Sequence, residues 1–161
     1  MVKIISSVLA DIGLGAWPSF IKDRFFILAL IAGVIGWLLL WFTVIPTFTV
    51  ARSSIVGIIV LTVIWYPLLE EILFRGIIQN YLFNKPWGRT TFASLSAANW
   101  LTSLLFVSVH FWYQPAMWAI LVVIPSLAYG FFRDRFASIY PSILLHSFYN
   151  AGLVGINFID G

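Results

Sequence analysis

The sequence predicts an all-α, polytopic transmembrane helical bundle, with about five crossings and an N-terminal interfacial helix. The chain has 161 residues, of which 61% are hydrophobic and only 9% charged, and its mean hydropathy is +1.00. Soluble domains are typically about 45–50% apolar and about 25% charged. The length suits one bundle, so we expect residues 1–161 to form a single transmembrane domain.

The N-terminal segment begins with the weak positive charge of Lys3, and its short apolar run stops at Asp11, which is not typical of a signal peptide. We therefore expect residues 4–20 to form an interfacial or loosely inserted helix. The first predicted span runs from Phe25 to Ile45, about 21 residues, which is enough to cross a hydrocarbon core of about 30 Å.

The second predicted span runs from about Ser54 to Phe83 and is long for one crossing. The third lies between Thr91 and Tyr113, but its first turns are rich in small and polar residues, which favours a start near Ala97 after a surface segment. The remaining predicted segments are the loop Asn84–Arg89, the turn Gln114–Pro115, a fourth span from about Ala116 to Phe132, the loop Arg133–Arg135 and a fifth span from Ile139 to Ile159.

The basic residues predict the orientation. If all five spans cross, Arg52 lies on one side of the membrane and seven others lie on the opposite side. These seven are Lys3, Lys22, Arg24, Lys85, Arg89, Arg133 and Arg135. Because cytoplasmic loops carry the excess of Lys and Arg, we expect a cytoplasmic N-terminus and a C-terminus outside. The net charge of +3 then reflects topology, and we expect contact with membrane lipids and no nucleic-acid partner.

Polar side chains interrupt three of the apolar spans. A charge at the centre of a membrane helix costs about 2.5–3.5 kcal/mol on insertion scales, so the cluster of Glu70, Glu71 and Arg75 indicates a functional site. The other polar residues within spans are Gln79 in the second, Asn99, Ser103 and His110 in the third, and His146, Ser147 and Asn150 in the fifth. Cysteine is absent, which excludes a thiolate nucleophile and disulfides.

Helical spacing assigns partners within the second span. Glu71 and Arg75 lie four residues apart with the acid first, the favourable order for an ion pair within a helix. Glu70 lies about 100° around the helix from Glu71, away from that pair. A carboxylate in a dry site suits a general base, whereas a structural ion-pair lock is the alternative interpretation of the cluster.

The same spacing recurs in the other two spans. His146 and Asn150 lie four residues apart and face one direction, so both can donate to one developing oxyanion. Phe106 precedes His110 by one turn. Hydrogen bonding between helices is the alternative for both histidines and for Asn150, and we interpret Asn99 and Ser103 as packing groups; these two serve no predicted catalytic role.

Three ordered motifs on apolar helices resemble those of the CPBP family, the CAAX-protease and bacteriocin-processing group of intramembrane endopeptidases. They are Glu70-Glu71-x-x-x-Arg75, Phe106-x-x-x-His110 and His146-x-x-x-Asn150. The flanking segments Pro67–Leu69, Phe74–Gly76 and Pro141–Leu145 are similar too. The resemblance covers about residues 60–155, and the combination is more specific than any one motif.

The resemblance implies a glutamic-type intramembrane protease in which Glu70, assisted by His110, activates a water. The other implied site residues are the oxyanion-hole pair His146 and Asn150 and the supporting pair Glu71 and Arg75. No cofactor is implied. A zinc metalloprotease with Glu70, His110 and His146 as ligands is the mechanistic alternative, although no HExxH signature is present.

The implied substrate is a membrane-anchored peptide or protein tail, cleaved near the cytoplasmic half of the bilayer. The short chain resembles small prokaryotic members more than the larger eukaryotic proteases that act on prenylated tails, so we expect the prokaryotic plasma membrane and an unprenylated substrate. Two other function classes remain open. One is a non-catalytic immunity or peptide-binding protein, which does not need Glu70, and the other is a small transporter or proton relay.

Overall fold

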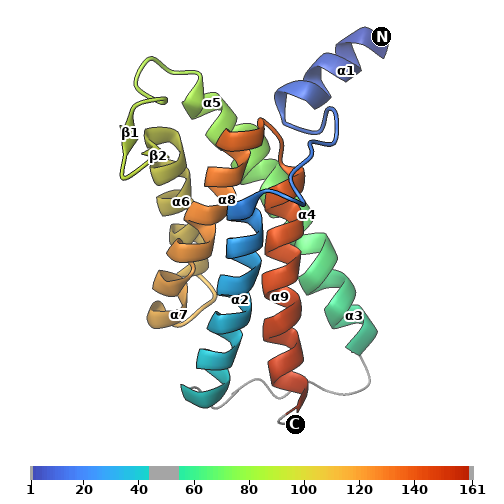
Figure 1. The fold of residues 1–161 in the computed structure, drawn as a ribbon, viewed down its shortest axis with the longest axis vertical. Helices are drawn as coiled ribbons and strands as arrows, with labels where there is room; N and C mark the ends of the chain where they lie inside the picture. The colour runs from blue at the N-terminus through green and yellow to red at the C-terminus, as the bar shows by residue number, and fades with distance from the viewer. Residues whose placement is uncertain (1, 44–54, 160–161) are drawn as a thin grey trace. The chain divides into compact units, whose positions relative to one another are not determined.

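The structure is a computed structural model that describes residues 2–43 and 55–159. It is almost entirely helical, which confirms the predicted all-α class (Figure 1). The elements in chain order are α1 (Val2–Asp11), α2 (Arg24–Thr43), α3 (Ile55–Ile59), the π-helical segment η2 (Val60–Trp65), α4 (Tyr66–Glu71), the π-helical segment η3 (Ile72–Gln79), α5 (Asn80–Phe83), β1 (Thr91–Phe92), β2 (Leu95–Ser96), α6 (Ala97–His110), α7 (Ala116–Leu121), α8 (Val123–Phe136) and α9 (Tyr140–Ile159).

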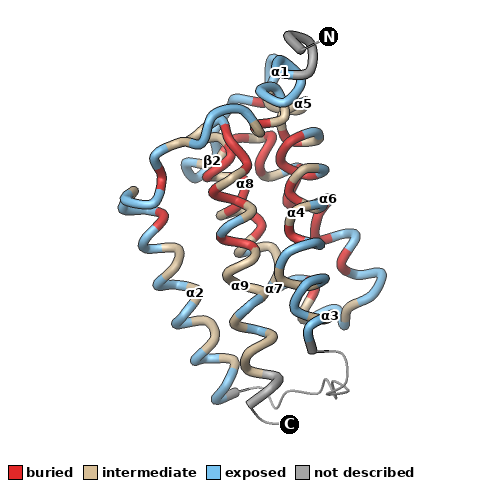
Figure 2. The backbone as a smooth tube through the Cα atoms, turned by 90° about the vertical axis from the view of Figure 1, so that its right-hand side faces the viewer, coloured by how far each residue is buried: buried red, intermediate tan, exposed pale blue. Residues whose placement is uncertain are grey.

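Three helices of the described chain are long and apolar enough to cross a membrane: Arg24–Phe42, Val56–Phe83 and Ala116–Phe136. Figure 2 shows exposed and intermediate positions along most of α2, as expected for a surface that faces lipid. The protein is therefore an all-α helical membrane protein, while the orientation and the number of crossings stay predictions. The predicted span ends at Ile45 and Ser54, and the basic residue Arg52, lie outside the described residues.

The chain divides into two compact units, with boundaries that fall inside helices. The first unit contains Met1–Pro18 and Glu70–Ile143, and the second contains Ser19–Leu69 and Leu144–Gly161. The single transmembrane domain stays a prediction.

In the first unit, α6 packs against α8, and η3 packs against both. Gly130 of α8 permits this close approach, because a Cβ atom there would overlap Asn99 Oδ1. Asn99 Nδ2 donates to the Leu127 carbonyl oxygen at 3.0 Å, and Ser103 Oγ donates to Asn99 Oδ1 at 3.1 Å. The predicted packing role of Asn99 and Ser103 is thus confirmed.

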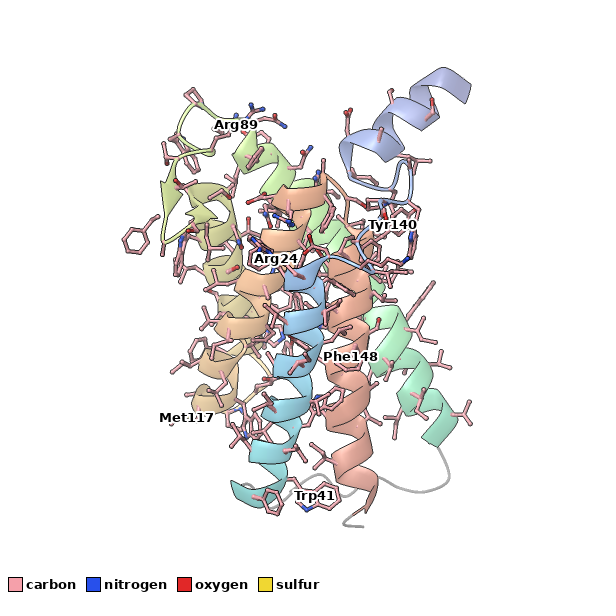
Figure 3. All side chains as sticks on the ribbon, in the orientation of Figure 1. Arg24, Trp41, Arg89, Met117, Tyr140 and Phe148 are labelled. Atoms are coloured by element: carbon pink, nitrogen blue, oxygen red, sulfur yellow. The ribbon has the colours of Figure 1, made fainter. Side chains whose placement is uncertain are left out.

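In the second unit, α2 and α9 pack closely. A Cβ atom on Gly152 would overlap the Trp37 ring, and Trp37 Nε1 donates to the Tyr149 carbonyl oxygen at 3.2 Å. The Tyr149 hydroxyl donates to the Ala29 carbonyl oxygen at 2.8 Å. Phe148, labelled in Figure 3, packs on Trp37 in a tilted arrangement with ring centroids 4.5 Å apart. Aromatic side chains thus hold α2 and α9 together by packing and by hydrogen bonds.

The predicted N-terminal helix over residues 4–20 is wrong in extent, because α1 ends at Asp11. Gly13 has φ +81°, a left-handed conformation that ends a helix, and its carbonyl oxygen accepts from Ile139 N at 3.1 Å. Tyr140 lies beside this segment (Figure 3), and its hydroxyl donates to the Leu14 carbonyl oxygen at 3.4 Å. The chain after α1 is therefore held by the start of α9.

The third span does not begin at Thr91. Residues 91–96 form a hairpin in which Thr91 pairs with Ser96, and α6 begins at Ala97, as the sequence favoured. Ser96 caps the helix, since its Oγ accepts from Asn99 N at 3.0 Å. The helix ends at His110 instead of Tyr113.

The predicted loop Arg133–Arg135 is wrong, because these residues form the last turn of α8. The charges suggested solvent, but Arg133 is only 7% exposed and its guanidinium donates to three oxygens of the first unit. The helix stops at Ala137, which has φ 50°. The predicted fourth span is otherwise present as α7 and α8, which meet at Val122.

Candidate active site

The predicted pair of Glu71 and Arg75 is confirmed. Glu71 ends α4 and Arg75 lies in η3; Arg75 Nε is 3.3 Å from Glu71 Oε2, and both side chains are 0% exposed. These two atoms lie at ion-pair distance but outside hydrogen-bond geometry, so their attraction is chiefly electrostatic. A buried charge needs such a partner, because desolvation of an unpaired ion costs several kcal/mol.

The Arg75 guanidinium also binds neutral groups from neighbouring helices. Its Nη2 donates to Ser126 Oγ of α8 at 2.7 Å, and its Nη1 donates to Gln79 Oε1 at 3.3 Å. The guanidinium lies over the Phe106 ring of α6, 5.5 Å from the centroid. Arg75 therefore joins η3, α6 and α8, which makes it a structural centre of the first unit.

Gln79 continues this buried network by two donations from its Nε2. One goes to the Gly130 carbonyl oxygen at 2.9 Å and the other to Asp134 Oδ1 at 2.7 Å. The second oxygen of Asp134 accepts from Ser96 Oγ at 2.5 Å. The polar residues on this face of η3 thus hold neighbouring helices together.

His110 occupies the C-terminal end of α6 and is buried. Its Nδ1 lies 2.8 Å from the Phe106 carbonyl oxygen. A carbonyl oxygen only accepts, so Nδ1 carries the hydrogen, and in the neutral ring Nε2 is the basic nitrogen. The Phe106 ring lies 4.5 Å from the imidazole and the Tyr113 ring 5.2 Å, centroid to centroid. These contacts fix the tautomer and the plane of the imidazole.

Glu70 occupies a different environment from Glu71, its neighbour in sequence. Glu70 is half-buried, and it lies near Tyr113, which belongs to the turn between α6 and α7, outside the three long apolar helices. Partial burial raises the pKa of Tyr113 to about 12, and the negative charge of Glu70 adds to that rise. Tyr113 therefore lies close enough to Glu70 to feel its charge, and its ring also contacts the His110 ring.

The positions of Glu70 and His110 along their helices also agree. At about 1.5 Å per residue, Glu70 lies about 20 Å before the helix end at Phe83, and His110 lies about 20 Å after the start of α6 at Ala97. Only a short loop and a hairpin separate these two ends. The late start of α6 therefore brings the two predicted catalytic side chains to a similar depth.

His146 and Asn150 lie one turn apart on α9, in the second unit. His146 is 6% exposed, and Asn150 Nδ2 donates to the Thr62 carbonyl oxygen of η2 at 2.9 Å. This bond supports the alternative in which Asn150 joins two helices. The role of the pair in an oxyanion hole stays a prediction, because Glu70 and His110 belong to the first unit.

Within residues 2–43 and 55–159, no three His, Cys, Asp or Glu side chains form a group placed to hold a metal ion. The zinc alternative takes Glu70 and His110 from one unit and His146 from the other. It stays an untested alternative.

A family model described as type II CAAX prenyl endopeptidase Rce1-like matches residues 52–152. The match covers more than half of the chain and includes all three motifs. The chain belongs to this family. No curated protein and no solved structure matches the chain significantly. Membership in the Rce1-like family confirms the predicted resemblance and makes the protein a CAAX-type intramembrane endopeptidase, and hence a peptide hydrolase.

Several residues of this Rce1-like chain were not predicted as part of the site region. Ser126 and Asp134 contact Arg75 and Gln79 across 51 and 55 positions of sequence. No spacing rule connects such distant residues. A small polar residue in the apolar helix α8 was the only signal for Ser126, and Tyr113 had none.

Proposed function

We propose that this member of the Rce1-like family cleaves a membrane-associated peptide or protein tail by a glutamic-type mechanism, with Glu70 as general base. The observation that carries the proposal is the contrast between two adjacent carboxylates. Glu71 is fully buried and ion-paired with Arg75, whereas Glu70 is half-buried and lies near Tyr113, whose ring is 5.2 Å from the His110 ring, centroid to centroid. The first has a structural partner, and the second has the surroundings of a base.

The proposed step places one water between Glu70 and His110. The water donates one hydrogen to the Glu70 carboxylate and the other to His110 Nε2, which turns its lone pair towards the scissile carbonyl carbon. As the new C–O bond forms, Glu70 takes the proton and the carbonyl electrons move to oxygen. Such base catalysis contributes about 10²–10⁴-fold and needs contacts of about 2.6–3.2 Å.

The tetrahedral intermediate then collapses. We assign the donors for its oxyanion to the His146 ring N–H and the Asn150 amide, which share one face of α9. The C–N bond breaks, and Glu70 returns its proton to the leaving amine, which restores the carboxylate. Arg75 holds Glu71 and so fixes the helix turn that carries Glu70.

For the substrate, we propose a membrane-anchored tail that does not require a prenyl group, although the family description names prenyl endopeptidases. The test uses two fluorogenic peptides of identical sequence, one prenylated and one carrying a simple acyl anchor, in vesicles that contain the purified protein. We expect cleavage of the acylated peptide at a comparable rate. Cleavage of the prenylated peptide alone contradicts the substrate proposal but leaves the mechanism intact.

The catalytic proposal is tested in the same vesicles with Glu70→Gln, and with Leu73→Ala as a control at an exposed position of the same helix. Glu70→Gln is expected to abolish cleavage and Leu73→Ala to leave it unchanged. A wild-type protein that binds peptides but cleaves none supports the non-catalytic alternative. Proton flux through the vesicles without cleavage supports the transporter alternative.

We propose that no metal takes part. Full cleavage is expected after prolonged treatment with a strong zinc chelator and removal of the chelator. Loss of activity that added zinc restores would instead support the alternative with Glu70, His110 and His146 as ligands.

A further inference from the structure

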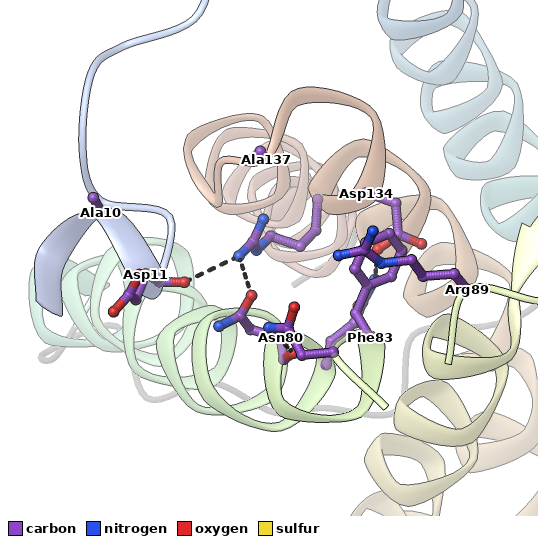
Figure 4. Close-up of a pocket in the computed structure, with 10 residues that line it drawn as sticks. Ala10, Asp11, Asn80, Phe83, Arg89, Asp134 and Ala137 are labelled. Atoms are coloured by element: carbon purple, nitrogen blue, oxygen red, sulfur yellow. Dashed lines mark hydrogen bonds between the residues drawn. The ribbon is translucent and has the colours of Figure 1, made fainter. Parts of the chain in front are cut away.

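A pocket of ≈ 310 Å³ opens in the first unit and shares no lining residue with the surroundings of Glu70 and His110 (Figure 4). Its lining includes Asp11, Asn80, Phe83, Arg89, Arg133 and Asp134, from the ends of α1, α5 and α8 and the loop after α5. This volume lies at the lower end of the range for small-molecule pockets, about 300–1,000 Å³.

Arg133 is the most informative residue of the pocket. Only 7% of the residue is exposed, and its Nε donates to the Arg75 carbonyl oxygen at 3.3 Å. Its Nη2 donates to the Asp11 carbonyl oxygen at 3.3 Å and to Asn80 Oδ1 at 3.1 Å, the bonds drawn in Figure 4. All three acceptors are neutral. In the part of the chain that the structure describes, Arg133 has no ion pair, and its Nη1 has no acceptor.

The carboxylates of the pocket make no direct ion pair with Arg133, although the charge of the neighbouring Asp134 attracts it. Asp134 follows Arg133 in sequence, but its two oxygens accept from Gln79 Nε2 and Ser96 Oγ. Asp11 is exposed and offers Arg133 its main-chain carbonyl. Because a buried cation is costly without an anion in direct contact, the unused Nη1 donors of Arg133 indicate a site for an anionic ligand.

A second guanidinium lines the same pocket. Arg89 is exposed and lies over the Phe83 ring, 5.1 Å from the centroid, which places its charge at the rim. Figure 4 shows Arg89 and Phe83 together on one side of the pocket. Two guanidinium groups at one pocket suit a phosphate, since each presents a planar fork of N–H donors.

The position of the pocket along the helices selects the source of the phosphate. It lies where the loop with Lys85 and Arg89 and the last turn of α8 bring basic residues together, on the side predicted to be cytoplasmic. Basic pockets between membrane helices at this level bind lipid headgroups. We propose that this pocket binds the phosphate of a phospholipid headgroup from the adjacent leaflet. The site is independent of the proposed hydrolysis.

The test measures thermal unfolding of the full chain in detergent with added short-chain phosphatidylglycerol, the matching phosphate-free diacylglycerol, or inorganic phosphate. A ligand that binds the folded state raises Tm, and the rise grows with the logarithm of the ligand concentration relative to its Kd. We compare wild type with Arg89→Gln, and with Lys85→Gln as a control for the same charge change in the same loop but outside the pocket. Arg89 is exposed, so its variant is expected to fold.

We expect phosphatidylglycerol to raise the Tm of wild type and Lys85→Gln alike, and Arg89→Gln to need at least tenfold more lipid for the same shift. The diacylglycerol is expected to give no shift. Equal responses of Arg89→Gln and Lys85→Gln would overturn the proposal, as would stabilisation by inorganic phosphate without any by the lipid. Arg89-dependent stabilisation by a peptide with a free C-terminal carboxylate, but not by lipid, would overturn it in favour of a peptide terminus.

Discussion

Arg75 Nε lies 3.3 Å from Glu71 Oε2, and neither side chain is exposed. The pair sits within one helix, but Arg75 also reaches Ser126 of α8 and the Phe106 ring of α6. One ion pair thus joins the helix that carries both glutamates to the two helices packed against it. This arrangement gives Glu71 a structural role, and the catalytic role is the one we propose for Glu70.

Removing either member of this pair is expected to destabilise the protein. Glu71→Gln leaves a buried guanidinium without its countercharge, and Arg75→Ala leaves a buried carboxylate, each at a cost of about 3–5 kcal/mol. Thermal unfolding in detergent measures the loss. The double variant Glu71→Gln/Arg75→Met is expected to lose less than the two single changes combined. Wild-type stability in both single variants would show that the pair contributes nothing.

Gly130→Ala is expected to destabilise the first unit. The added methyl group would overlap Asn99 Oδ1, so α6 and α8 must separate, at about 1–3 kcal/mol. Gly36→Ala is the matched control, because nothing lies within 4 Å of a Cβ atom there. It is expected to be neutral or stabilising, since Ala favours a helix over Gly by about 1 kcal/mol. Equal Tm values for the two variants would argue against this packing.

Tyr113→Phe is expected to leave the shape of the pH–rate profile unchanged below about pH 10. The pKa of Tyr113 is raised to about 12, so its hydroxyl keeps its proton throughout that range and cannot act as the base. The rate itself is expected to fall only modestly, through altered packing on His110. Loss of a basic limb from the profile would assign an ionising role to Tyr113.

A reporter that is active only in the cytoplasm, fused after Gly161, is expected to stay silent. The Lys and Arg asymmetry predicts a C-terminus outside, although the burial of Arg133 removes one of the seven residues from that count. A fusion to the N-terminus serves as the positive control. A bright signal from the C-terminal fusion would reverse the orientation or change the number of crossings.

Local patterns predicted the parts of the structure that depend on neighbours in sequence. The Glu71–Arg75 pair follows from a spacing of four residues, and the start of α6 at Ala97 follows from the polar segment before it. Both features are set within one or two helical turns. The helical class followed from hydropathy for the same reason.

Features that depend on distant residues could not be predicted. The charges at Arg133 and Asp134 suggested a loop, but acceptors and donors from α1, α5 and β2 allow both residues to be helical, with Arg133 buried and Asp134 partly buried. The partner of Arg75 at Ser126 also comes from another helix, 51 residues away. No pattern within one segment contains this information.

We propose that Glu70 and Glu71, adjacent in sequence, perform different functions. The most direct test measures cleavage and Tm together for Glu70→Gln. Its amide is isosteric with the carboxylate but cannot take a proton from water, so kcat/KM is expected to fall by about 10²–10⁴-fold or more while Tm stays at the wild-type value. Full activity of Glu70→Gln on a substrate that the wild type cleaves would contradict the account.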